Sequence, residues 1–270
     1  MAAALWIVSD GLWKRVEPLL PKVERRSRFP GRKRLSDRQA LQGILVVLHT
    51  GIAWRHLPLE LGFGSGSTCY RRLDEWQQAG VWERLHALLL AELRAAGEIE
   101  WSRAVADSSH VQAKKRGSET GPSPVDRARN GSKHHLLVDA TGIPLAWRLT
   151  GGNRNDVTQL IPLIDAVPAV RGRVGRPRQR PARLAADRGY DHDKYRRQLR
   201  RRGIAPEIAR RQTEHGSGLG RYRWVVERTF AWLHHLKRLL VRYDRRAEIH
   251  EAFLALGCCL VCFRRLQRSF

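Results

Sequence analysis

The spacing of apolar residues divides this chain into two parts that meet near residue 100. In the first part apolar residues recur every three or four positions, which is the period of a helix with one buried face. In the second part short apolar runs, typical of strands, alternate with helical stretches. We therefore expect an all-helical domain over residues 1–100 and an α/β domain over residues 101–270.

Three helices are predicted in the first part. One follows Ser36, where Ser-Asp-Arg-Gln fits a capping box, and ends at Gly51. The second begins at Ser67 and carries Arg71 and Arg72 on one side, and a third helix follows it. Short helices with a basic member indicate a helix-turn-helix-like module in which Arg71 and Arg72 contact DNA. A plain helical bundle that packs on the second domain is the alternative, because the first connecting loop is long.

The second part reads as three strands, a helix, a strand, a helix, a strand and further helices. This order predicts a mixed five-stranded sheet with helices on its faces. The turn at Asp139-Ala-Thr-Gly142 has the chemistry of a hairpin. The predicted strands are 103–107, 134–138, 145–149, 183–187 and 205–209, and the predicted helices are 157–166, 193–202, 221–240 and 248–266.

Positive charge is concentrated in the second part of the chain. The formal net charge is +24, and residues 1–100 hold 15 basic and 11 acidic residues, so most of the excess lies beyond residue 100. Such an excess opposes compaction through self-repulsion, so it indicates a polyanionic partner. Three basic loops could follow a phosphate backbone, and the first opens with Lys114, Lys115 and Arg116. These loops span 114–133, 171–183 and 210–223.

The remaining composition argues against export, membrane insertion and a cysteine metal site. The N-terminus has no signal-peptide pattern, and no uncharged stretch reaches the ~18 residues of a membrane span. Cys258, Cys259 and Cys262 lie in an apolar helical stretch without a fourth ligand nearby, so we expect them to be buried. A cytoplasmic protein without membrane association is predicted.

Asp107 and Asp187 each end a predicted strand. That edge of an open α/β sheet is where ligands bind. Two carboxylates that meet there repel one another unless a cation lies between them, and Mg²⁺ is a hard cation that prefers oxygen ligands. Each aspartate alone could simply cap the next element.

Two other acidic residues are candidates. Glu227 borders the apolar stripe of the predicted helix 221–240, with Arg223 four residues earlier; in isolation the two would be an ordinary i,i+4 ion pair. Asp156 begins a predicted helix, so an N-capping role is favoured over a ligand role.

The residues around these carboxylates resemble the catalytic blocks of insertion-sequence DDE transposases, in particular the large "IS-five" type. The resemblance runs in order through nearly the whole chain, and its N-terminal part includes residues 50–58 and 81–84. The blocks in the second part are ADSS (106–109), ADRGYD (186–191), and Arg223 with ERTFAW (227–232).

The resemblance implies an RNase H-like fold in which Asp107, Asp187 and Glu227 form a catalytic triad that binds two Mg²⁺ or Mn²⁺ ions. It implies double-stranded DNA as the partner, both the element's terminal repeats and the target. A homodimer or larger assembly formed on that DNA is expected.

The chain departs from a pattern of related families, Tyr-x2-Arg-x3-Glu-x6-Lys. Arg223 and Glu227 match it, but Gly220 stands in place of Tyr and His234 in place of Lys. Lys237 lies one helical turn further on and could substitute. Arg223 and Lys237 are therefore further candidate DNA contacts.

We predict a transposase that cuts the element's ends and joins the freed 3′-OH to target DNA by metal-assisted phosphoryl transfer. A catalytically inactive DNA-binding relic and a cut-only metal nuclease of the same fold are the alternatives. A covalent recombinase is less well supported, because none of the five tyrosines has a recognisable Arg and His cluster around it.

Overall fold

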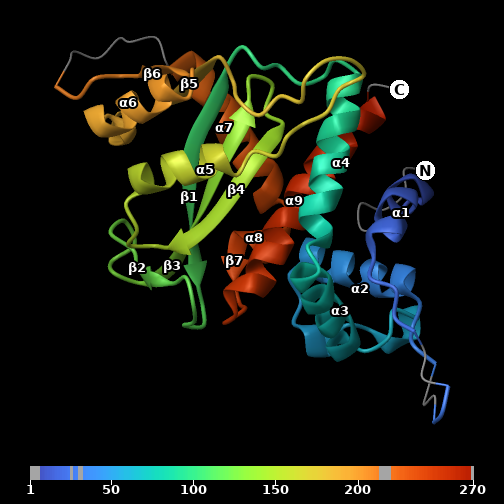
Figure 1. Ribbon diagram of the computed structural model, residues 1–270. Helices are drawn as coiled ribbons and strands as arrows, with labels where there is room; N and C mark the ends of the chain where they lie inside the picture. Colours follow the sequence, from blue (N-terminus) through green and yellow to red (C-terminus); the bar gives the residue numbers. More distant parts are fainter. Residues whose placement is uncertain (1–6, 25–26, 30–32, 213–219, 269–270) are drawn as a thin grey trace.

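A computed structural model describes residues 7–24, 27–29, 33–212 and 220–268 (Figure 1). The α-helices are α1 (Asp10–Val16), α2 (Asp37–Thr50), α3 (Gly66–Gln78), α4 (Val81–Ala95), α5 (Leu160–Asp165), α6 (Asp193–Arg201), α7 (Gly220–His234), α8 (Lys237–Leu240) and α9 (Ala247–Arg268). Short 3-10 helices are η1 (Glu17–Leu19), η2 (Trp54–His56), η3 (Leu59–Leu61), η4 (Asp156–Gln159) and η5 (Arg188–Tyr190). The strands are β1 (Ala104–Ala113), β2 (Gly121–Pro122), β3 (Asn130–Asp139), β4 (Pro144–Gly151), β5 (Arg183–Ala186), β6 (Ala205–Ile208) and β7 (Val241–Arg242).

The main sheet has the order β4-β3-β1-β5-β6, to which the short β2 and β7 add at β3 and β1. β1, β3 and β4 form an antiparallel meander, whereas β5 and β6 run parallel to β1. Helices flank this sheet, and α7 and α9 pack against its strands (Figure 1). The arrangement is RNase H-like, so the predicted fold class is confirmed. The predicted hairpin turn is present, with Asp139 accepting hydrogen bonds from the N–H groups of Thr141 and Ile143.

β1 is longer than predicted and continues to Ala113, so Asp107 lies inside this strand and not at its end. The prediction stopped at Asp107 because Ser108, Ser109 and His110 are polar. These residues nevertheless pair with β3, because ladder hydrogen bonds come from the backbone and do not require apolar side chains.

Both predicted ends of α2 are confirmed: Ser36 is the N-cap residue, and Gly51 ends the helix in the left-handed conformation. The expected capping hydrogen bond from the Ser36 side chain is absent, however, and two other boundary predictions were wrong. Ser65, not Ser67, caps α3. The predicted helix 221–240 is two helices, because Leu236 between α7 and α8 has an extended backbone.

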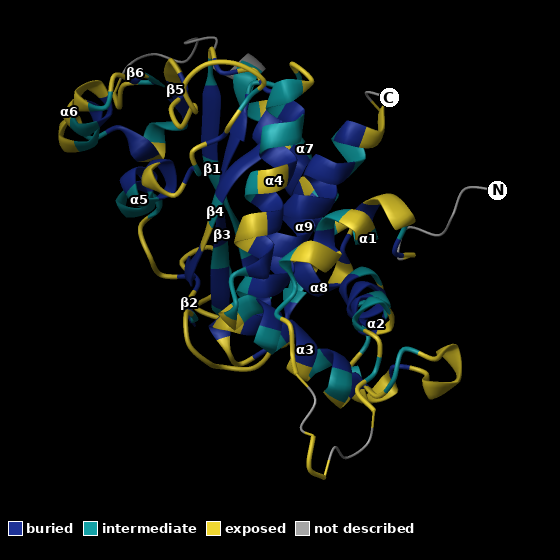
Figure 2. Cartoon of the chain, turned by 45° about the vertical axis from the view of Figure 1, so that its right-hand side comes forward, coloured by how far each residue is buried: buried dark blue, intermediate teal, exposed yellow. Residues whose placement is uncertain are grey.

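The N-terminal helices share one hydrophobic core with the second part of the chain. The Trp54 ring stacks on Phe253 of α9 at 5.7 Å between centroids, and His86 of α4 hydrogen-bonds the carbonyl of Pro144 at 2.8 Å. Buried residues are concentrated along α9 (Figure 2), which holds Cys258, Cys259 and Cys262 with no exposed surface, as predicted. This shared core fits the alternative interpretation of the N-terminal helices as a plain bundle that packs on the second part of the chain. The division at residue 100 stays a prediction.

No helix in the described ranges has the length and hydropathy that crossing a bilayer would require.

Candidate active site

Asp107 and Asp187 come together at the junction of β1 and β5. Ala104 and Val105 pair with Leu184 and Ala185, so β1 leaves its parallel partner just before Asp107. Asp187 follows the last residue of β5 directly and accepts a hydrogen bond from the Gly189 N–H at 2.9 Å. The two aspartates therefore lie on neighbouring parallel strands, where ligands bind in such sheets.

Glu227 reaches the same place from α7, which packs across β1. The helix is fixed on the β3–β4 turn by two side chains that follow Glu227. The buried Thr229 hydroxyl donates to the Gly142 carbonyl at 2.9 Å, and Arg228 donates to the Thr141 carbonyl at 2.5 Å. The direction of α7 is therefore set by tertiary hydrogen bonds.

Arg223 links two of the carboxylates. Its Nη2 atom is 3.6 Å from Oδ2 of Asp107 and 3.7 Å from Oε1 of Glu227. The Asp107 side chain is mostly buried and that of Glu227 is 59% exposed, so the pair spans the rim of the site. The guanidinium partly offsets negative charge that would otherwise be repulsive.

The charge on Asp107 is disfavoured by its surroundings. Burial raises the pKa of this carboxyl to about 6, although the Ser108 N–H and the charge of Arg223 act in the opposite direction. The negative charges of Asp187 and Glu227 raise the pKa further. A cation at this position would relieve that cost.

The ligand chemistry of these side chains fits a hard divalent cation, since all three offer carboxylate oxygens. Among the residues that the structure describes, however, no three His, Cys, Asp or Glu side chains are close enough together to hold a metal ion as they stand. Arg223 contacts Asp107 and Glu227 in this arrangement.

Tyr190 also belongs to this region, and the sequence analysis missed it. Its side chain is 3% exposed, and the Ser108 side chain lies close enough to lower the pKa of its hydroxyl. Burial raises the pKa of Tyr190 well above its usual range, and the negative charges of Asp107, Asp156 and Asp187 act in the same direction. The signal in the sequence that could have identified Tyr190 was its position three residues after Asp187.

Asp156 does not have the predicted capping role. Asn155 caps η4 instead, with its side chain accepting from the Val157 N–H. Asp156 forms an ion pair with Lys133 at 2.8 Å, so the charge of its carboxylate is balanced by this lysine.

The basic residues predicted to contact DNA differ in exposure. Arg72 is 4% exposed, donates to the Leu35 carbonyl and lies 3.4 Å from Asp37, so its side chain is used inside the fold. Because Arg72 is buried, its guanidinium cannot contact a DNA phosphate in this arrangement. The side chains of Arg71, Lys114, Lys115, Arg116 and Lys237 are exposed.

Lys237 is not a simple extension of the helix that carries Glu227. α7 ends at His234, and Lys237 begins the separate helix α8 next to Gly51. Gly220 begins α7. Residues 213–219, which precede it and belong to the predicted basic loop 210–223, lie outside the described residues.

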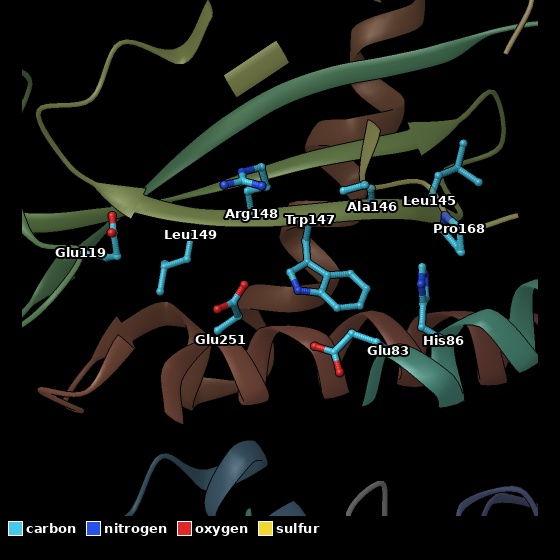
Figure 3. A pocket seen from close by; sticks show the side chains of 11 residues that line it. Glu83, His86, Glu119, Leu145, Ala146, Trp147, Arg148, Leu149, Pro168 and Glu251 are labelled. Atoms are coloured by element: carbon cyan, nitrogen blue, oxygen red, sulfur yellow. The ribbon is translucent and has the colours of Figure 1, made fainter. Parts of the chain in front are cut away.

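A cavity of about 400 Å³ lies elsewhere, between β4 and the helices α4 and α9 (Figure 3). Its lining includes Glu83, Trp147 and Glu251, and none of the three candidate carboxylates. It is therefore distinct from the β1–β5 site.

Two family profiles match the chain. Residues 102–262 match the "Transposase DDE domain", and residues 8–86 match "Putative transposase of IS4/5 family".

Two proteins from Burkholderia cepacia are similar in sequence. A "Putative transposase for insertion sequence element IS402" is 66% identical over 151 residues, which are 56% of this chain and 72% of that protein. An "Insertion element IS402 uncharacterized 16.2 kDa protein" is 56% identical over 119 residues, which are 44% of this chain and 81% of that protein.

Similarity to solved structures is weak. The Mos1 strand transfer complex aligns at a TM-score of 0.34 with 12% identity, covering 96% of this chain and 83% of that one. The Mos1 mariner paired end complex with Mn aligns at 0.34 with 13% identity, covering 95% and 83%. Likeness at this level is too low to assign a function.

The assignment therefore rests on sequence. The transposase profile covers more than half of the chain, and a relative matched over 72% of its length is 66% identical. The chain belongs to the DDE transposases of insertion sequences, in the IS4/5 family.

Proposed function

We propose that Asp107, Asp187 and Glu227 are the catalytic triad of this transposase. The observation that supports the proposal is their proximity: two neighbouring strands and a helix, far apart in sequence, carry three carboxylates near enough for Asp187 and Glu227 to raise the pKa of Asp107. Placing like charges close together costs folding free energy, and such an arrangement is typical of a functional site.

Mg²⁺ or Mn²⁺ is the proposed cofactor, as a pair of ions. Such ions, when bound, activate the attacking oxygen and stabilise the leaving oxygen of a phosphodiester. Asp107 and Asp187 would hold the cofactor from the sheet, and Glu227 would hold it from α7.

Arg223 has a second proposed role, as a positioning residue. It contacts Asp107 and Glu227 in the described arrangement. The planar guanidinium of Arg223 also matches a DNA phosphate geometrically, so it would position the substrate beside the carboxylates that would hold the cofactor.

Double-stranded DNA is the proposed substrate, both at the element's ends and at the target. The excess of positive charge provides sequence-independent attraction to phosphates. The exposed Arg71, Lys114, Lys115, Arg116 and Lys237 are proposed phosphate contacts. Assembly as a homodimer or larger complex on DNA is proposed as well.

The test is a strand-transfer assay. The purified chain is incubated with a labelled duplex that carries one end of its own element, supercoiled target plasmid and Mg²⁺. We expect nicked element DNA and then covalently joined product. Cleavage without joining would identify a nuclease, and a gel shift without cleavage would identify a DNA-binding relic.

A further inference from the structure

A second site lies where the N-terminal helices meet the second part of the chain. It is a pocket of about 750 Å³ at the end of β1 that is remote from β5. Two of the helices that carry its lining, α3 and α8, are labelled in Figure 1. Its lining comes from the loop after α2, from α3, from the loop after β1, and from the segment between α8 and α9.

Three cations at this pocket have no carboxylate partner among the described residues. Arg55, Lys115 and Arg245 line the pocket and are exposed. The other two arginines in the lining are already neutralised: Arg238 lies 3.2 Å from Asp244, and Arg246 lies 2.7 Å from Asp74. The free positive charge therefore comes from three separate segments of the chain.

Two buried arginines hold these segments in place. Arg238, 4% exposed, donates to the carbonyls of Gly51 and Ile52 and so fixes the loop that carries Arg55. Arg242, with no exposed surface, donates to the carbonyls of Ser118 and Glu119 and so fixes the loop after β1. The pocket is therefore preorganised, which reduces the entropic cost of binding.

The wall of the pocket also contains unsatisfied polar atoms and aromatic surface. Nε of Arg238, Nε1 of Trp54 and Oδ2 of Asp244 are buried without a hydrogen-bond partner in the described structure. The Tyr243 ring is 39% exposed, which leaves an aromatic face for a sugar or base.

We propose that this junction pocket binds the sugar-phosphate backbone of the DNA that the active site cuts, through Arg55, Lys115 and Arg245. The inference rests on the proposed function for its substrate. Because Arg55 belongs to the N-terminal helices and the other two cations do not, DNA bound here bridges both parts of the chain. The N-terminal region then positions DNA even if it reads no base.

The distance between the two sites sets where the contact falls. Asp107 and Ala113 are six residues apart in β1, which is about 20 Å of strand. Successive phosphates of a DNA strand are about 3.4 Å apart along the helix axis. On a duplex that runs along β1, the contacted phosphates should therefore lie about six base pairs or more from the cleavage position.

The affinity of the protein for an arbitrary 30-base-pair duplex tests whether these charges contribute to DNA binding. An arbitrary duplex is sufficient because phosphate contacts do not depend on base sequence. The variant Lys115→Ala/Arg245→Ala should bind about tenfold more weakly at ~150 mM salt, with a salt slope shallower by roughly two. Arg200→Ala, an exposed arginine on α6, is the control for loss of one charge. A double variant that loses no more affinity per charge than this control would overturn the proposal.

A cleavage probe tests the position. The four native cysteines are buried, so a single Lys115→Cys can be labelled selectively with iron-EDTA. Hydroxyl radicals should cut an element-end duplex about six base pairs or more from the nick that the wild-type enzyme makes. Cuts no stronger than those from labelled Arg200→Cys would refute the site. The duplex-binding result is independent of catalysis, so it separates this outcome from failure of the proposed triad.

Discussion

At the scale of single residues, the proposed ligand set depends on charge more than on size. Glu227 is 59% exposed and borders α7, so a substitution there leaves the core intact. Asp107 is mostly buried, and its carboxylate accepts a hydrogen bond from the Ser108 N–H at 2.8 Å. Amide substitutions at these positions therefore separate chemistry from folding.

Glu227→Gln should bind DNA and fold like the wild type but lose both cleavage and joining, by roughly a thousandfold or more. The amide keeps the size of the side chain and removes the charge that helps to hold a cation. The measurement is strand cleavage of an element-end duplex in Mg²⁺, beside a gel shift in Ca²⁺.

Asp107→Asn and Asp187→Asn should behave in the same way, and double variants should be hardly worse than single ones, because the three residues act as one unit. Asp156→Asn is the comparison, since its carboxylate is paired with Lys133. Normal cleavage by Glu227→Gln, or abolished cleavage by Asp156→Asn with intact binding, would show that the third ligand has been misassigned.

The hydroxyl of Tyr190 lies near Ser108, which follows Asp107 in β1. Tyr190→Phe keeps the buried ring and removes this hydroxyl. We expect cleavage to fall roughly tenfold and the Mg²⁺ concentration for half-maximal activity to rise, since residues that orient metal ligands have effects of this size. An unchanged Mg²⁺ dependence would mean that Tyr190 serves only packing.

At the scale of secondary-structure elements, the placement of α7 decides whether Glu227 reaches the sheet. Helix propensity alone cannot direct the helix, because its ends and its rotation are set by what it packs against. The Thr229 hydroxyl, which bonds the Gly142 carbonyl, is the most buried of the polar groups that attach α7 to the β3–β4 turn.

Thr229→Val should lower the free energy of unfolding by about 1–2 kcal/mol, because the Gly142 carbonyl is left without this donor while the shape is preserved. Denaturant unfolding of the wild type, Thr229→Val and Thr229→Ser would measure it. Valine keeps the methyl group and loses the hydroxyl, whereas serine keeps the hydroxyl and loses the methyl group, so wild-type stability of Thr229→Val would contradict the expectation.

At the scale of the whole molecule, buried histidines connect the sheet to α9. His134 of β3 and His250 of α9 have no exposed surface, and their Nε2 atoms are 2.8 Å apart. Burial lowers the pKa of His250 to about 3, and the charges of Arg242 and Arg238 act in the same direction. Burial also lowers the pKa of His134 well below its usual range.

These histidines should make the protein less stable in acid. Below about pH 6.5 these histidines bind protons in the unfolded state but stay neutral in the folded state. The free energy of unfolding therefore decreases as the pH falls below that value. In His250→Gln, the loss between pH 6.5 and 5 should be shallower by about 1.4 kcal/mol per pH unit. Denaturation at several pH values measures this, with the exposed His235→Gln as control. Identical pH slopes for wild type and His250→Gln would contradict the expectation.

The sequence by itself determined the features that depend on a few neighbouring residues. The helical and strand segments follow from apolar spacing, and Gly51 and Gly142 mark turns because they adopt positive φ angles. The fold class followed from the order of these segments. The family was indicated by contiguous blocks such as the one around Asp187, which required no knowledge of distance in space.

Tertiary structure alone decided what depends on partners far along the chain. Polar Ser108 to His110 continue β1 because β3 supplies their backbone partners, and Arg72 is buried because Asp37 and Glu75 lie beside it. Arg223 meets Asp107 from more than a hundred residues away, and the junction pocket collects its cations from three segments. Local propensity does not predict such long-range contacts, because the burial and charge pairing of a side chain are determined only when the elements pack together.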